Sequence, residues 1–175
     1  MPLLEFKGKR PKIDPKAYVS PRAFISGDVE VGAKSSVFDF ASIRGDFSPI
    51  KIGKNSSIQD NCSVHCGMSP CSIGDNVTVG HNAVIHSATV GNNVIIGMHS
   101  TILDGANIGD NCIVGAGAVV TENMVVEPKT LVVGNPAKPV KDIGMKQTAL
   151  IRMSATSYSD LAQKYKKTIE EQSKD

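Results

Sequence analysis

An aliphatic residue returns at every sixth position of this chain, a spacing that fits neither an α-helix nor an ordinary β-strand. Two three-residue insertions and one single-residue deletion interrupt the series, which then resumes in step. Its eighteen members are Ile13, Val19, Ile25, Val31, Val37, Ile43, Ile52, Ile58, Val64, Ile73, Val79, Ile85, Val90, Ile96, Ile102, Ile108, Val114 and Val120. Because the period survives these interruptions, it indicates a structural repeat.

Many members are followed by glycine, and small residues such as Cys62, Ala83 and Ala118 recur two places before the next aliphatic residue. This hexapeptide pattern is typical of a parallel β-helix, in which each short strand turns one branched and one small side chain inward. Three hexads close one triangular coil, so eighteen members predict six coils. We therefore expect a mainly β fold in one domain, residues 1–175, with the β-helix over about residues 11–140.

The pattern changes in the last third of the chain. After Val120 the six-residue spacing is expected to fail, with Pro128 interrupting it and residues 134–139 forming a turn that ends the coils. Apolar residues from about 142 to 172 follow helical spacing. Ser159 followed by Asp160 resembles a helix start, which predicts two C-terminal helices, at about 143–154 and 159–172, lying along one face of the prism.

Composition excludes several classes of function. The net charge is +2 with 21% charged residues, and no basic stripe suggests nucleic acid. No apolar run approaches the roughly 20 residues of a membrane span, and the first ten residues lack the apolar core of a signal peptide. We expect a cytoplasmic protein that binds neither nucleic acid nor a membrane.

Histidines give the strongest chemical signal. His65 and His86 follow Val64 and Ile85, which the repeat places one above the other in adjacent coils. Stacked strands lie about 4.8 Å apart, so the two imidazoles could share a metal ion. A catalytic zinc normally takes three protein ligands and leaves one position for water. The third candidate, His81, lies on another side of the prism and would have to come from a neighbouring chain, which predicts a homotrimer.

His99 serves as an internal comparison, because it falls out of this stack and is assigned no role. Zn²⁺ is the expected ion, although three imidazoles also suit Fe²⁺ or Co²⁺.

The cysteines fall into two pairs. Cys62 and Cys112 occupy small inward positions and are expected to pack in the core. Cys66 and Cys71 lie in an insertion, where free thiols, a local disulfide and metal ligation all remain open, with free thiols favoured in a reducing cell.

The sequence resembles the gamma-class carbonic anhydrases over about residues 10 to 160. The matching segments are Arg44-Gly45-Asp46, Gln59-Asp60, His65, Gly80-His81, His86, Gly97-Met98, Leu103-Asp104-Gly105-Ala106 and Gly134-Asn135-Pro136-Ala137. The resemblance implies a left-handed β-helix and a homotrimer with shared metal, in which His65 and His86 come from one chain and His81 from the next. It also implies carbon dioxide and bicarbonate as the substrate pair.

The resemblance suggests roles for further residues. Gln59 matches an amide that orients the bound water or substrate. Arg44 is expected to meet Asp60 of the adjacent chain in an ion pair, with Asp46 in the same cluster, although a purely structural ion pair is equally compatible. Tyr158 matches a tyrosine that can approach the pocket, and packing is an equal alternative for it.

The sequence also departs from the archetypal members. Their proton-carrying acidic residues fall in the loops that read Phe47-Ser48-Pro49-Ile50-Lys51 and Cys66-Gly67-Met68-Ser69-Pro70-Cys71 here, with no carboxylate in either. Ser57 stands where many relatives have Asn. These loops resemble a shorter, loop-poor branch of the family. Two alternatives therefore stay open: a hexapeptide acyltransferase or acyl-CoA hydrolase, and a non-catalytic, metal-stabilised trimeric assembly protein.

Overall fold

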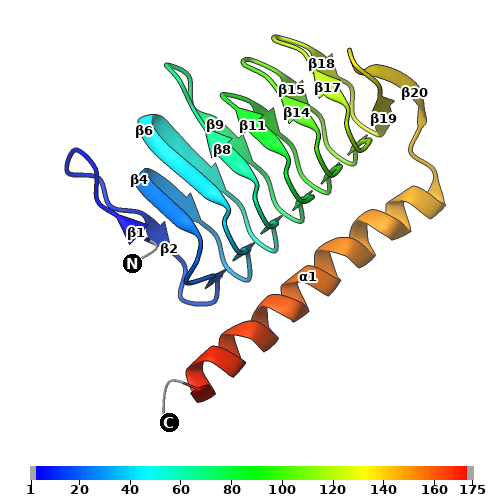
Figure 1. The fold of residues 1–175 in the computed structure, drawn as a ribbon. Coiled ribbons are helices and arrows are strands. Elements are labelled where there is room, and N and C mark those ends of the chain that lie inside the picture. Colours follow the sequence, from blue (N-terminus) through cyan, green and yellow to red (C-terminus); the bar gives the residue numbers. More distant parts are fainter. Residues whose placement is uncertain (1–2, 173–175) are drawn as a thin grey trace.

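The computed structural model describes residues 3–172, leaving aside the side chain of residue 170. Short parallel strands stack into a three-sided solenoid, and one long helix runs beside it (Figure 1). This arrangement confirms the predicted mainly β parallel β-helix with a helical C-terminal segment.

The first and third sides of the solenoid belong to one 12-stranded sheet. They join because β4 (Phe24–Val31) and β6 (Ser42–Ile52) continue around the corner that separates these two sides. The other strands of this sheet are β1 (Leu3–Leu4), β2 (Lys12–Ile13), β8 (Ser63–His65), β9 (Cys71–Ile73), β11 (Val84–His86), β12 (Thr89–Val90), β14 (Thr101–Ile102), β15 (Asn107–Ile108), β17 (Val119–Val120) and β18 (Val125–Val126).

The second side is an 8-stranded sheet. Its strands are β3 (Tyr18–Val19), β5 (Ser36–Val37), β7 (Ser57–Ile58), β10 (Thr78–Val79), β13 (Ile95–Ile96), β16 (Ile113–Val114), β19 (Thr130–Val133) and β20 (Lys138–Asp142). All pairs in it are parallel except β19 with β20, which form an antiparallel closing pair. The first strand of each coil therefore leads to the second side, and the chain returns to the first side one coil higher.

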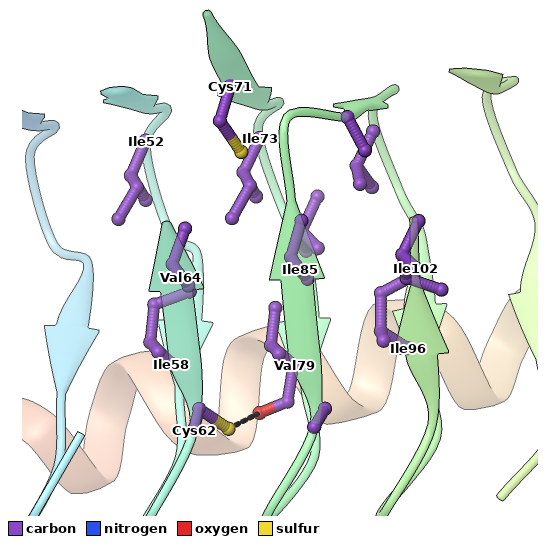
Figure 2. Packing of buried hydrophobic residues seen from close by; sticks show 14 of the residues in the cluster. Ile52, Ile58, Cys62, Val64, Cys71, Ile73, Val79, Ile85, Ile96 and Ile102 are labelled. Atoms are coloured by element: carbon purple, nitrogen blue, oxygen red, sulfur yellow. Dashed lines mark hydrogen bonds between the residues drawn. The ribbon is translucent and has the colours of Figure 1, made fainter. Parts of the chain in front are cut away.

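The periodic aliphatic residues fill the interior, as the repeat predicts. Val64, Ile85 and Ile102 lie in register on the third side, and Ile58, Val79 and Ile96 do so on the second. All six are fully buried, and they form continuous columns (Figure 2). Each residue removed from water contributes roughly 1.5 to 3 kcal/mol, so this aliphatic core can hold the solenoid without large aromatic rings.

The expected failure of the six-residue spacing after Val120, and with it the count of six coils, is wrong. Val126 and Val132 continue the six-residue series, both are buried, and the solenoid has about seven turns. Pro128 does not interrupt the repeat because it lies in the turn of a corner, directly before Lys129, whose φ is 61°. Proline is pre-set for the first central residue of a turn whose next residue has positive φ. The residue therefore suits the corner that it occupies.

The C-terminal segment is one helix, α1 (Met145–Gln172), rather than the two that were predicted. Ser159 does not begin a new helix. Its hydroxyl donates to the carbonyl of Lys34, which ties the helix to the solenoid. Ile151, Ala155 and Ala162 are buried at spacings of four and seven. One continuous apolar face of the helix therefore extends across the segment that contains Ser159. The helix lies against β3, β5, β7 and β10, which confirms its predicted place along one face. Over the described range, no helix is long and apolar enough to cross a membrane.

Candidate metal centre

His65 and His86 are stacked as the repeat predicted. They are direct partners in the parallel pair β8 and β11, and Arg44 of β6 is the partner of His65 in the coil below. The centroids of the two imidazole rings lie 5.1 Å apart, with 54° between the ring planes. Both side chains leave the third side at its end, just after an inward-facing aliphatic residue. The fold therefore brings two nitrogen-bearing rings together without any special loop.

Two carboxylates hold this pair of rings from opposite ends. Asp46 Oδ1 lies 2.8 Å from His65 Nε2, while Asp104, from the coil beyond His86, hydrogen-bonds His86 Nδ1. Asp46 also accepts from the Arg44 guanidinium at 2.5 Å. The series Asp46, His65, His86 and Asp104 thus spans four successive coils. Each ring has one nitrogen engaged by a carboxylate and the other left for a further partner.

The electrostatics of Asp46 favour a permanent negative charge. Burial by itself raises the pKa of this carboxyl, but the hydrogen bond from His65 and the nearby Arg44 charge together outweigh burial. The net result is a pKa below the ordinary value for aspartate. Asp46 is therefore a carboxylate at neutral pH, able to accept hydrogen bonds from Arg44 and His65 together.

His81 lies at a different corner, the one between the second and third sides, in the turn directly after β10. Its Nδ1 is 2.9 Å from Asp60 Oδ2, and both side chains are 41% exposed. Within the part of one chain that the structure describes, no three candidate ligands come together. One chain thus offers a pair of imidazoles at one corner and a single imidazole at another.

The remaining predicted residues are placed as follows. Gln59 is buried directly after β7, next to Asp60. Arg44 pairs with Asp46 within the chain, and its predicted contact with Asp60 of another chain stays a prediction. Tyr158 packs against Phe38, with ring centroids 6.2 Å apart, in the small aromatic cluster beneath α1. This position matches the packing alternative for Tyr158.

His99 lies outside the stack, as expected, and faces the Asn82 amide at 3.4 Å.

All four cysteines are free and buried, which agrees with the favoured interpretation of free thiols at Cys66 and Cys71. Burial raises the pKa of the Cys62 and Cys71 thiols to about 11. These two thiols are therefore neutral at neutral pH, and both sulfur atoms pack in the hydrophobic core.

Asp104 is the residue whose contact the sequence did not reveal. It falls within a segment that matches the gamma-class carbonic anhydrases, but the sequence pattern gives it no role. The available signal was its position two residues after Ile102, which is the partner of Ile85 in the next coil. A residue at the corner after Ile102 can contact the residue that follows Ile85 in the previous coil, namely His86.

The donor set fits a zinc ion in its chemistry. His81 and His86 have Nδ1 engaged by a carboxylate, which leaves Nε2 for a metal, and His65 has Nε2 engaged, which leaves Nδ1. Imidazoles held by a carboxylate through the second nitrogen are the usual ligands of such sites. Further neutral nitrogen ligands would have to come from outside a single chain.

Comparisons with known proteins place this chain in a family. The model of the bacterial transferase hexapeptide (six repeats) matches residues 87–122, and that of the hexapeptide repeat of succinyl-transferase matches residues 70–102. The carnitine operon protein CaiE of Citrobacter koseri is 34% identical over 158 residues, covering 90% of this chain and 80% of the relative.

Two further relatives are informative. Gamma carbonic anhydrase 1, mitochondrial, of Arabidopsis thaliana is 39% identical over 168 residues, covering 92% of this chain but only 61% of that longer protein. A crystal structure of a Bacillus cereus protein provisionally designated an acetyltransferase is 37% identical, covers 95% of this chain and 97% of its own, and superposes with a TM-score of 0.94.

These relatives span more than one activity, so they support a wider group than the gamma-class carbonic anhydrases that the sequence resembles. Their coverage nevertheless extends over nearly the whole described solenoid and helix. The chain belongs to the hexapeptide-repeat family that includes the CaiE proteins.

Proposed function

We propose that this protein catalyses the reversible hydration of carbon dioxide to bicarbonate at a zinc site shared between the chains of a homotrimer. The observation that carries the proposal is the division of the histidines: His65 and His86 stack at one corner, while His81 lies at another. The 39% identity to a gamma carbonic anhydrase supports the choice of reaction.

The division of ligands also supports the trimer. Two imidazoles leave a tetrahedral ion short of its third protein ligand. A neighbouring chain that turns its His81 corner toward the His65 and His86 corner supplies that ligand, and three-fold symmetry repeats the contact at every interface. His81 suits this role because its ring is half exposed and held by Asp60.

A zinc ion held by His65, His86 and a neighbouring chain's His81 would supply hydroxide at neutral pH, because such an ion lowers the pKa of a bound water toward about 7. The chain's own residues do the rest. Arg44 and Asp46 fix the His65 ring, Asp104 contacts the His86 ring, and the Gln59 amide would orient the water or the substrate. No carboxylate lies in the Phe47–Lys51 or Cys66–Cys71 loops, so the proton would leave through water, buffer or another group.

The test combines metal analysis of freshly purified protein with stopped-flow hydration of carbon dioxide. The wild type should hold about one zinc per chain and hydrate faster than buffer, and His81→Ala should lose both properties. His99→Ala is the matched control, because His99 is an exposed-corner histidine outside the stack. Metal-free wild type that cannot be reloaded would refute the site. Stoichiometric metal without hydration would refute this reaction and favour the non-catalytic assembly protein.

Acyl-group chemistry is the second candidate, and the specific observation in its favour is the match to transferase hexapeptide models together with the Bacillus cereus structure. Acyl-CoA hydrolysis would use the same activated water. An acyl-CoA hydrolysis or transfer assay on the metal-loaded protein distinguishes the two: hydration without acyl turnover supports the first candidate, and the reverse supports the second.

A further inference from the structure

The side chain of Asp104 engages one nitrogen of a predicted metal ligand. Its Oδ1 hydrogen-bonds His86 Nδ1, although Asp104 itself is 52% exposed and comes from the next coil. We propose that Asp104 is a positioning residue, which keeps the His86 proton on Nδ1 and thereby leaves the Nε2 lone pair for the metal. The proposal rests on the proposed metal-binding function.

The backbone around Asp104 is held on both sides. The Leu103 amide donates to Val120 O at 3.0 Å, the Gly105 amide donates to Ser87 O at 2.9 Å, and the Asn123 amide donates to Asp104 O at 2.9 Å. The turn therefore spans neighbouring coils above and below. A carboxylate on so fixed a backbone can hold a ring in one orientation even though it is partly in water.

Gly105 lets this turn pack closely against Asn123 of the next coil. Its φ is +70°, and a Cβ at this position would lie 2.3 Å from Asn123 Oδ1. A larger residue would have to shift that amide and adopt a conformation that L residues rarely take. The place of Asp104 beside His86 is therefore built into the corner.

The two stacked rings are engaged by different carboxylates through different nitrogens. A neutral imidazole carries one proton, so the nitrogen that donates to a carboxylate cannot bind a metal. Asp46 engages His65 through Nε2, whereas Asp104 engages His86 through Nδ1. Without Asp104, His86 would be free to carry its proton on Nε2, the nitrogen that the metal requires. Asp46 is fixed by Arg44, but it acts on the other ring and cannot replace this contact.

The test begins with metal-free protein, so that it does not depend on activity. Nitrogen NMR of ¹⁵N-histidine-labelled protein reports which ring nitrogen carries the proton, at a pH well above the ordinary imidazole value of about 6.5. Wild-type His86 should show a proton on Nδ1. Asp104→Ala should lose that preference, and zinc affinity measured by competition with a chelator should fall roughly 10- to 100-fold.

Glu122→Ala is the matched control, because Glu122 occupies the same corner position one coil further along, two residues after Val120. It should leave the His86 tautomer and the zinc affinity unchanged. Asp104→Asn keeps the shape of the side chain and should shift both readouts in the same direction by a smaller amount, which keeps the test usable if the alanine variant does not fold.

A proton on Nε2 in wild-type protein would overturn the proposal. So would an Asp104→Ala variant that matches Glu122→Ala in both tautomer and affinity. If the wild type binds no zinc at all, the proposed function fails, whereas the tautomer of the metal-free protein still decides the role of Asp104. The two failures are therefore distinguishable.

Discussion

His81 Nδ1 lies 2.9 Å from Asp60 Oδ2, across two adjacent coils at the corner between the second and third sides of the prism. His81 lies at a different corner from the His65 and His86 pair of the same chain. The contact with Asp60 leaves Nε2 of His81 for a partner outside the chain. One protomer therefore carries a single histidine, His81, at one corner and the His65 and His86 pair at another.

Replacing Asp60 by alanine should weaken metal binding without unfolding the protein. Both side chains of the pair are 41% exposed, so little stability is expected to depend on the contact. Loss of the carboxylate frees the His81 ring, and zinc affinity should fall roughly 10- to 100-fold. Chelator competition measures the affinity, and Asp28→Ala, which removes a partly exposed ion pair with Lys9, is the control. Equal affinities for the two variants would contradict this role.

The buffer should determine the rate of hydration. The loops beside the stacked histidines expose Phe47 and Met68 and contain no carboxylate that could carry the proton away. At saturating carbon dioxide, kcat should therefore rise steadily with the concentration of an imidazole-type buffer. Introducing a carboxylate by Met68→Glu should raise kcat most at low buffer. A wild-type rate independent of buffer would show that a proton carrier exists elsewhere.

The aliphatic columns should dominate stability. Ile85 is fully buried among the stacked residues of the third side, so Ile85→Ala should cost about 2 to 5 kcal/mol in the free energy of unfolding. Val84 precedes it on the same strand and is 37% exposed. Val84→Ala should therefore cost much less, roughly 1 kcal/mol or below. Denaturant unfolding of the two variants checks the difference, and similar losses would argue against a solenoid interior at this position.

The buried thiols should make the protein less stable in alkali. The folded-state pKa values of Cys62 and Cys71 are about 11, above the ordinary value of 9.0. Because the pKa is raised in the folded state, the contribution of each thiol to the free energy of unfolding is complete below pH about 9. It is lost as the pH rises toward about 11. At about 1.4 kcal/mol per pKa unit, each thiol accounts for a loss of roughly 2 to 3 kcal/mol across that window.

The double variant Cys62→Ala, Cys71→Ala should lose this part of the alkaline decline. Alanine suits both positions, because Ala83 and Ala88 occupy them in the next coil. Unfolding free energies measured from pH about 8 to about 11 would show a shallower slope for the variant than for the wild type. Parallel slopes would mean that these thiols ionise as readily in the folded chain as in the unfolded one.

The sequence predicts the solenoid because its period is set by backbone geometry: one branched residue must point inward on every short strand. It predicts the His65 and His86 stack for the same reason, since adjacent coils stay in register. The seventh coil does not follow from the pattern, because Pro128 indicates a break although a corner accepts it. The single helix was missed because Ser159 bonds to Lys34, a contact that depends on tertiary structure. The contact between Asp104 and His86 does not follow from the sequence, because it depends on the direction of the Asp104 side chain at its corner. The six-residue period does not determine that direction.

The shared site can be tested most directly by mixing subunits. His81→Ala and His65→Ala chains each lack one ligand, so neither homotrimer should bind zinc tightly. Trimers reassembled from both should regain some intact sites, because a His81 corner from one variant can meet a complete His65 and His86 corner from the other. We predict that zinc binding and hydration return only in the mixture. Mixed trimers, verified by mass, that bind no zinc would contradict a site built from two chains.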